Sequence, residues 1–241
     1  MGTVFSFDVR GGGDRVAAAL HAAAAWLHHV DEVFSTYRPD SQISRLAAGT
    51  LTLSACSPDV REVLALCETA GRLSHGWFST GYAGGFDPTG LVKGWAVERA
   101  VAMLASAGAD AVCLNGGGDV QVYGGPWRIG VADPLRPGAL VRVVHTDGEL
   151  AVATSGPAER GCHILDPFTH QPPAPALASL TVVCRGLTDA DARATAGYAM
   201  GPARARRWLE SLPDTEGFAV AADGATWQTA GYGVTTAAHT P

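Results

Sequence analysis

The sequence predicts one α+β domain in which helices pack on a largely antiparallel sheet. Three observations support this fold class. Apolar residues recur at helical spacing before residue 107, the period changes toward two from Asp110 onward, and glycine, proline or aspartate separates the short strands that follow. Neither an internal repeat nor a linker divides residues 1–241, so we expect a single domain with a mobile tail from about residue 234.

The first half is predicted to contain one strand and four helices. Residues 3–10 alternate as a strand, and three consecutive glycines end it. A long helix is expected over residues 14–36, with Asp14 as its cap, and a short capped helix over residues 40–46. Pro58 begins a helix that ends near Gly71, and a further helix covers about residues 92–107, after a glycine-rich aromatic loop over residues 76–90.

The second half is predicted to supply most of the sheet. Apolar alternation bounded by turn residues predicts strands over residues 111–115, 120–123, 127–131, 141–145, 150–154 and 179–184, and a closing hairpin over residues 218–221 and 226–229. Four prolines make residues 168–178 a connection. Helices are expected from Asp189 and over residues 202–212.

Composition argues against several classes of function. A formal net charge of −6 does not suit a nucleic-acid backbone, and Arg204, Arg206 and Arg207 are expected on a solvated helix face. No apolar run is long enough for a membrane span, and no signal peptide precedes Asp8, so the chain as written is expected in the cytoplasm. Five widely spaced cysteines without a C-x-x-C pair predict reduced thiols and give no support for zinc.

A carboxylate and a hydroxyl stand four residues apart at Asp191 and Thr195, after an apolar strand-like run. On a helix this spacing brings both side chains to one face, where their oxygens suit Mg²⁺ better than zinc. The alternative is that an Asp or Thr ahead of an alanine-rich run only caps the helix. Spacing alone favours the cap.

Three further segments carry polar groups that a loop or strand can present. Lys93 lies near the expected start of a helix, behind glycine, where its ammonium and the free N–H groups suit an anion, although such loops are common. Gly116-Gly117-Gly118 fails the dinucleotide pattern because Gln121 takes the place of the third glycine, so a hairpin turn is favoured. His163, three residues before Asp166, suits an acid–base group or a structural turn histidine.

Taken in order, these segments resemble the motifs of the ApbE-type FAD:protein FMN transferases over nearly the whole chain. The matching segments are M-G-T at 1–3, Y-R-P-D-S-Q-I-S-R at 37–45, D-P-T-G-L-V-K-G-W-A-V-E at 87–98, N-G-G-G-D at 115–119, A-T-S-G at 153–156, H-I-L-D-P at 163–167 and D-A-R-A-T-A at 191–196. The resemblance implies an ApbE-like, T-fold-related architecture.

The resemblance also implies an activity: Mg²⁺-dependent cleavage of FAD, with FMN passed through a phosphoester bond to a threonine or serine of an acceptor protein and AMP released. Mn²⁺ would also suit the oxygen ligands. By the same resemblance Asp191 and Thr195 supply metal side chains, the carbonyls of Val92 and Ala194 supply main-chain ligands, and His163 activates the acceptor hydroxyl. An FAD pyrophosphatase and a non-catalytic FAD-binding protein are the alternatives.

The FAD pocket implied by the resemblance is lined by residues from five parts of the chain. Its members are Met1, Tyr37, Thr89, Lys93, Trp95, His163 and Ile164, with Trp77, Phe78 and Ser79 beside them. The connection over residues 78–87 is shorter than in longer relatives, so one pocket wall is expected to be reduced or supplied by a second subunit of a homodimer. Met1 matches an internal methionine of the family, so upstream residues with an export signal are an alternative to the cytoplasm.

Overall fold

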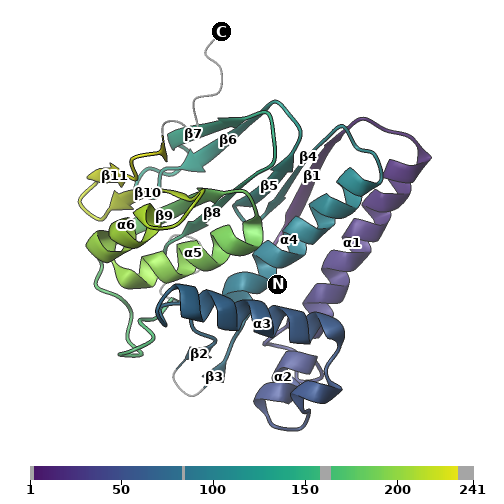
Figure 1. The fold of residues 1–241 in the computed structure, drawn as a ribbon, viewed down its shortest axis with the longest axis horizontal. Coiled ribbons are helices and arrows are strands. Elements are labelled where there is room, and N and C mark those ends of the chain that lie inside the picture. Colours follow the sequence, from purple (N-terminus) through teal and green to yellow (C-terminus); the bar gives the residue numbers. More distant parts are fainter. Residues whose placement is uncertain (1–2, 83–84, 158–163, 233–241) are drawn as a thin grey trace.

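The computed structural model describes residues 3–82, 85–157 and 164–232, and its centre is a seven-stranded antiparallel sheet (Figure 1). The strand order is β1-β4-β5-β8-β9-β10-β11, and every neighbouring pair is antiparallel. These strands are β1 (Phe5–Arg10), β4 (Ala111–Gly116), β5 (Asp119–Tyr123), β8 (Leu150–Ser155), β9 (Leu177–Cys184), β10 (Glu216–Ala221) and β11 (Thr226–Gln228). The predicted α+β class with a largely antiparallel sheet is confirmed.

Two short ribbons lie outside the main sheet. They are formed by β2 (Gly81–Tyr82) with β3 (Gly85–Phe86), and by β6 (Trp127–Ala132) with β7 (Leu140–Thr146). Both strands of the second ribbon were expected from apolar alternation, but that alternation does not distinguish a strand of the main sheet from one packed over it. The assignment of β6 and β7 to a separate ribbon is decided by tertiary packing.

The helices match the predicted ones in number and order within the described residues. They are α1 (Asp14–Phe34), α2 (Gln42–Ala47), α3 (Pro58–Leu73), α4 (Thr89–Ser106), α5 (Leu187–Met200) and α6 (Pro202–Glu210), with a 3₁₀ turn at Leu53–Ala55. Gly13, rather than Asp14, is the N-cap of α1. Ser41 and Ser57 cap α2 and α3, since each side chain accepts a backbone N–H bond three residues later.

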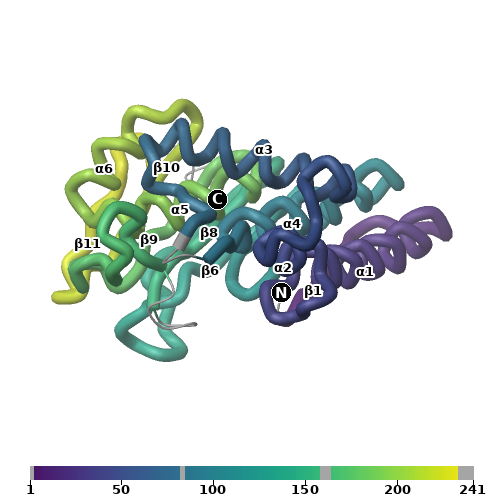
Figure 2. The backbone as a smooth tube through the Cα atoms, turned by 90° about the horizontal axis from the view of Figure 1, so that it is seen from below, coloured from purple at the N-terminus to yellow at the C-terminus, as the bar shows by residue number. Residues whose placement is uncertain are grey.

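The main sheet is covered on both faces. Helices α4 and α5 lie across one face with α1 beside α4 (Figure 1), and α3 crosses outside α4 and α5 (Figure 2). The β6–β7 ribbon packs on the opposite face. A hydrophobic core lies on each face of the sheet, and strand β9 contributes to both. Leu180 and Val182 pack with the helices, while Val183 packs with the ribbon. This two-sided burial explains why every residue of β9 is buried.

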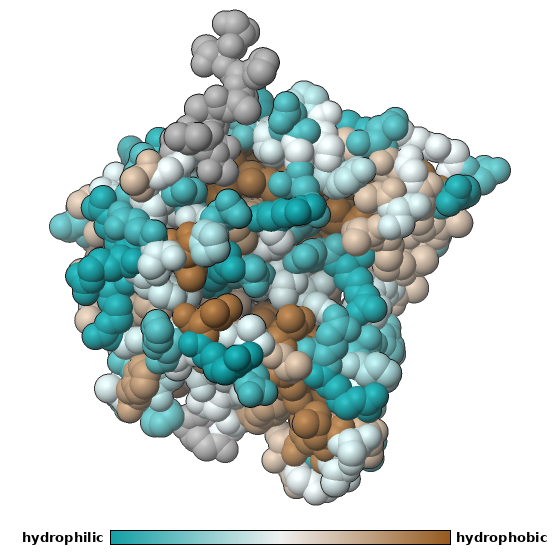
Figure 3. Space-filling model, in the orientation of Figure 1, coloured by the Kyte–Doolittle hydropathy of each residue, from teal (hydrophilic) through white to brown (hydrophobic). Residues whose placement is uncertain are grey.

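The outer face of the helical layer mixes hydrophilic residues with small hydrophobic patches (Figure 3). Among the described helices, none combines the length and apolar content that a bilayer span requires. Cys56, Cys67, Cys113 and Cys184 are free thiols, as the spacing predicted, whereas Cys162 lies outside the described residues.

Candidate active site

A cavity of about 740 Å³ opens between the helical layer, the β4–β5 turn and the β6–β7 ribbon. This volume lies within the range of ordinary small-molecule and cofactor sites. The polar part of its wall is formed by Asp87, Thr89, Lys93, Asn115, Thr154, Ser155, Asp191 and Thr195, and the apolar part by Val120, Ile129, Val131, Val152, Ile164 and Ala178. A pocket whose lining has both a polar and an apolar part suits a ligand that joins a charged group to flat rings.

Helices α4 and α5 cross closely beside this cavity because α4 carries glycine at residue 94. A Cβ atom on Gly94 would lie 2.4 Å from the carbonyl oxygen of Leu187 and 2.9 Å from the Cβ of Asp191. A Cβ atom on Gly90 would lie 3.5 Å from the Thr195 hydroxyl oxygen. The absence of a side chain at residue 94 therefore lets α5 approach the α4 backbone directly, whereas a methyl group at residue 90 would make only ordinary van der Waals contact.

Asp191 and Thr195 face the cavity from this crossing, one turn apart on α5, with 5% and 7% of their surfaces exposed. The Asp191 carboxylate accepts a hydrogen bond of 3.0 Å from the backbone N–H of Gly94. Helix α5 begins at Leu187 with Gly186 as its N-cap, so neither side chain caps the helix. The capping alternative is excluded, and the spacing brings a carboxylate and a hydroxyl to the same wall of the cavity.

Side chains from other elements satisfy the first N–H groups of α5. Gln121 of β5 accepts the Leu187 N–H at 2.8 Å, and Glu98 of α4 accepts both the Thr188 N–H at 2.8 Å and its hydroxyl at 2.6 Å. These tertiary caps fix the start of α5 against α4 and the sheet. Sequence reasoning missed them because the partners lie 66 and 90 residues away.

Lys93 also reaches the cavity, but its surroundings differ from the prediction. Helix α4 begins at Thr89, so Lys93 lies in the second turn and its backbone N–H is not among the free groups of the helix end. Its ammonium lies 2.5 Å from the carboxylate of Asp119. Sequence reasoning missed Asp119, and the available signal was an acidic residue directly after the Asn-Gly-Gly-Gly turn.

The start of α4 and the segment that begins at residue 164 supply two predicted pocket residues. Thr89 lines the cavity, and its N–H is held at 2.8 Å by the Asp87 carboxylate, which replaces a cap at the start of the helix. Ile164 also lines the cavity and is 5% exposed. Met1 and His163 lie outside the described residues.

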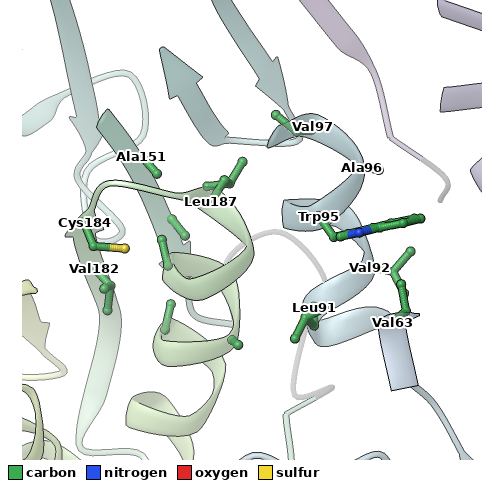
Figure 4. Close-up of a cluster of buried hydrophobic side chains, with 14 of the residues drawn as sticks. Val63, Leu91, Val92, Trp95, Ala96, Val97, Ala151, Val182, Cys184 and Leu187 are labelled. Carbon is green, nitrogen blue, oxygen red and sulfur yellow. The ribbon is translucent and has the colours of Figure 1, made fainter. Parts of the chain in front are cut away.

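Trp95 does not line the cavity, contrary to the expectation. It lies on the side of α4 that faces away from α5, near Val63 (Figure 4). Its ring packs edge-on against Trp26 and Phe34, and its indole N–H donates to Glu62 at 3.0 Å. Successive residues of a helix are about 100° apart around its axis, so Lys93 and Trp95, two positions apart, point to nearly opposite sides of α4.

The segment at residues 77–79 is also outside the cavity wall. Phe78 is buried in the core behind Gly90, and Trp77 stacks edge-on with Phe168 at 4.9 Å while the Arg204 guanidinium lies over its ring. Ser79 closes a local turn by accepting the Gly81 N–H at 3.1 Å. None of the three therefore forms the cavity wall itself, and a place for them beside the FAD pocket stays a prediction from the resemblance.

The structure places Tyr37 outside the cavity wall, and it places Val92 and Ala194, the predicted main-chain ligands, on the two crossing helices. Tyr37 is 96% exposed and does not line the cavity, although its neighbour Thr36 does. Val92 and Ala194 are fully buried residues next to Lys93 and Thr195, on the two helices that cross. A metal-ligand role for their carbonyls stays a prediction from the resemblance. In the described parts of the chain, no group of three or more His, Cys, Asp or Glu side chains is arranged so that it could hold a metal ion.

Comparison with known protein families gives a match that covers most of the sequence. The model described as the ApbE family matches residues 1–84 and 82–219. The chain belongs to the ApbE family. The matched ranges include Lys93, Asp119, Asp191 and Thr195, so the polar wall of the cavity lies within the ApbE family region.

Two curated relatives of this ApbE family member are named FAD:protein FMN transferase. The protein from Rhodobacter capsulatus is 33% identical over 184 residues, which cover 71% of this chain and 32% of the relative. The one from Vibrio cholerae is 30% identical over 131 residues, covering 49% of this chain and 39% of the relative. The chain thus spans about a third to two fifths of the length of the curated relatives that it matches.

Solved ApbE structures share the fold. The flavin transferase ApbE from Vibrio cholerae superposes with a TM-score of 0.82 at 20% identity, covering 96% of this chain and 95% of that one. The apo Pseudomonas stutzeri flavinyl transferase ApbE gives 0.81 at 25% identity, covering 100% and 95%. The ApbE protein from Thermotoga maritima gives 0.80 at 20% identity, covering 97% and 99%. The predicted ApbE-like architecture is confirmed.

Proposed function

We propose that this ApbE family member transfers FMN from FAD to a threonine or serine hydroxyl of an acceptor protein, with release of AMP. The observation that carries the proposal is the convergence of Asp191 and Thr195 on one wall of a cavity large enough for a cofactor. The names of the curated relatives support the same reaction class.

The donor set at the α4–α5 crossing fits Mg²⁺. Asp191 offers a carboxylate held by the Gly94 N–H, and Thr195 offers a hydroxyl one turn further along α5. Hard oxygen donors of this kind suit Mg²⁺, and Mn²⁺ as well. We infer that the carbonyls of Val92 and Ala194 complete the protein ligands. When bound, the ion supplies charge neutralisation to the diphosphate of FAD.

The residues of the chain itself would contribute binding and orientation. Lys93 brings a cation to the polar wall, where it suits the negative charge of a diphosphate. The apolar wall, with Ile129, Val131 and Ile164, suits a flat ring system. Thr89, in the first turn of α4, belongs to the polar wall and would place the phosphates near the helix N-terminus.

The proposed reaction breaks the phosphoanhydride bond of FAD and forms a phosphoester bond to the acceptor. The acceptor hydroxyl oxygen forms a bond to the phosphorus of the FMN half, and the bond from that phosphorus to the bridging oxygen breaks. The electron pair of that bond leaves with AMP, and the hydroxyl proton passes to a base, for which His163 stays the predicted residue. Such a transfer depends mainly on alignment and charge neutralisation and needs no covalent intermediate on the protein.

One incubation tests the proposal against its two alternatives. The purified chain is mixed with FAD, MgCl₂ and an acceptor domain carrying a threonine flavinylation site, and AMP is followed by chromatography while the acceptor mass is measured. Transfer predicts AMP in equal amount to an acceptor heavier by one FMN residue. AMP with free FMN would assign a pyrophosphatase, and FAD binding without AMP would assign a binding protein. Samples with EDTA or MnCl₂ test the metal requirement.

A further inference from the structure

Lys93 is the only lysine among the 17 lysine and arginine residues of the chain. It is also poorly exposed, with 15% of its side chain accessible, and it forms an ion pair of 2.5 Å with Asp119, whose side chain is 2% exposed. Exposed ion pairs such as Arg185–Glu149 and Arg206–Glu210 use arginine instead. The single ammonium group is therefore placed at the cavity wall, against a buried carboxylate.

The position of Asp119 explains how that carboxylate is held. Strands β5 and β8 pair only as far as Val120 and Val152, and beyond that point the Asp119 side chain accepts the Thr154 N–H at 2.9 Å. The Thr154 hydroxyl in turn bonds the Thr181 hydroxyl of β9 at 2.9 Å. One carboxylate oxygen of Asp119 is thus anchored to the sheet while the other meets the ammonium of Lys93.

We propose that Asp119 is the positioning residue for Lys93, and that the pair presents one ordered ammonium to the diphosphate of FAD. This inference rests on the proposed function for the identity of the anion. Lysine loses more conformational freedom on ordering than almost any other side chain. An ammonium already held by Asp119 is ordered before the ligand arrives, and its charge is at the correct place when negative charge shifts in the transition state.

The compactness of an ammonium is part of the same inference. A guanidinium is planar and broad, whereas an ammonium directs three donors from one point and can bridge a carboxylate and a phosphate oxygen. In the space between α4 and β5, Lys93→Arg is therefore not a conservative change. We expect it to lower the rate of AMP release about as strongly as Lys93→Met does.

Selective isotope labelling tests the positioning directly, because ¹³C-lysine gives this chain a single lysine signal. In the unmodified protein we expect two distinct Hε resonances and slow side-chain motion at Cε. Addition of FAD should shift this signal, and riboflavin, which has no phosphate, should not. In Asp119→Asn the two Hε resonances should merge and the motion should increase. A freely moving Lys93 in the unmodified protein, or a signal unaffected by Asp119→Asn or by FAD, would overturn the inference.

A double-mutant cycle on AMP release distinguishes positioning from a merely structural role. We expect Asp119→Asn to lower kcat by about tenfold or more while KM changes by less than about threefold, because the misplaced charge matters most in the transition state. In a Lys93→Met background, Asp119→Asn should have no further effect beyond about twofold. Independent, multiplicative losses would show that Asp119 does not act through Lys93 and would overturn the proposal.

Two controls keep both tests interpretable. Glu149→Gln removes the carboxylate of an exposed ion pair with Arg185 and should leave the lysine signal and kcat unchanged. The double variant Lys93→Met/Asp119→Asn removes both charges and avoids a buried charge without its partner, so it stays usable if Asp119→Asn unfolds. Equal rates for Lys93→Met and the double variant would then support the inference, and unequal rates would reject it. If the unmodified chain releases no AMP, the proposed function fails, and the FAD and riboflavin titrations still decide the inference.

Discussion

The backbone N–H of Gly94 donates a 3.0 Å hydrogen bond to the Asp191 carboxylate across the crossing of α4 and α5. The two residues are 97 positions apart in the chain, and only a glycine at residue 94 lets the helices approach this closely. The same contact that packs the helices therefore also orients a carboxylate at the cavity wall. Stability and the geometry of the candidate site are coupled at this point.

Replacing Gly94 by alanine tests this coupling. The new methyl group would lie 2.4 Å from the Leu187 carbonyl oxygen, so the helices must separate. We expect the free energy of unfolding to fall by about 1–3 kcal/mol and AMP release to fall with it. Denaturant unfolding and the AMP assay measure both effects. Gly12→Ala is the control, because no atom lies within 4 Å of its Cβ position. A Gly94→Ala protein with unchanged stability would contradict the packing argument.

Asp191→Asn separates the charge of the carboxylate from its structural hydrogen bond. The amide oxygen can still accept the Gly94 N–H, so we expect the melting temperature to change little. Loss of the anionic ligand should lower metal-dependent AMP release by about 100-fold or more, since metal-ion charge stabilisation is worth several kcal/mol. Asp189→Asn, two residues earlier on α5 and 61% exposed at its side chain, is the matched control. Full turnover in Asp191→Asn would remove Asp191 from the proposed site.

Trp95→Phe distinguishes a core residue from a pocket residue. The substitution removes the indole hydrogen bond to Glu62 and some packing against Trp26, so unfolding should become easier by about 1–3 kcal/mol. Because Trp95 lies outside the cavity wall, the Kd for FAD should stay within about threefold of the unmodified value. Isothermal titration gives that Kd. Loss of FAD affinity without loss of stability would return Trp95 to the pocket.

The thiols of Cys67 and Cys184 should resist alkylation in the folded protein. Burial raises the pKa of Cys67 to about 12 and that of Cys184 to about 11, and the carboxylate of Asp87 adds to the effect at Cys67. The thiolate fraction at pH 8 is then small, so reaction with iodoacetamide should be about 100-fold or more slower than for an exposed cysteine. Peptide mass spectrometry after timed alkylation measures each site. Rapid labelling before urea is added would contradict the burial of these thiols.

The helices and strands follow closely from local sequence. Ser41 and Ser57 precede α2 and α3 as their caps, and the alternation of apolar residues identifies β6 correctly. The start of α5 could not be placed from local signals, because its first N–H groups are satisfied by Gln121 and Glu98 from other elements. The start of α4 was expected one turn too late because Gly90 weakened the helical pattern.

Some features of the candidate site were also predictable from local sequence, and others were not. The four-residue spacing of Asp191 and Thr195 determines that both face one side of a helix, and the ordered motifs indicated the ApbE family. The pairing of Lys93 with Asp119 and the removal of Trp95 from the pocket were not predictable. Local spacing gives no information on which side of α4 faces the cavity when both sides are buried.

The sequence by itself determined most of the elements, the fold class and the hydroxyl–carboxylate pair on α5, because these depend on periodicity, caps and spacing within a few residues. The tertiary structure decided which partners the site residues have: Gly94 for Asp191, Asp119 for Lys93, and the core for Trp95. The physical reason is that these contacts join segments 26 or more residues apart, and long-range packing selects them from many locally equivalent alternatives.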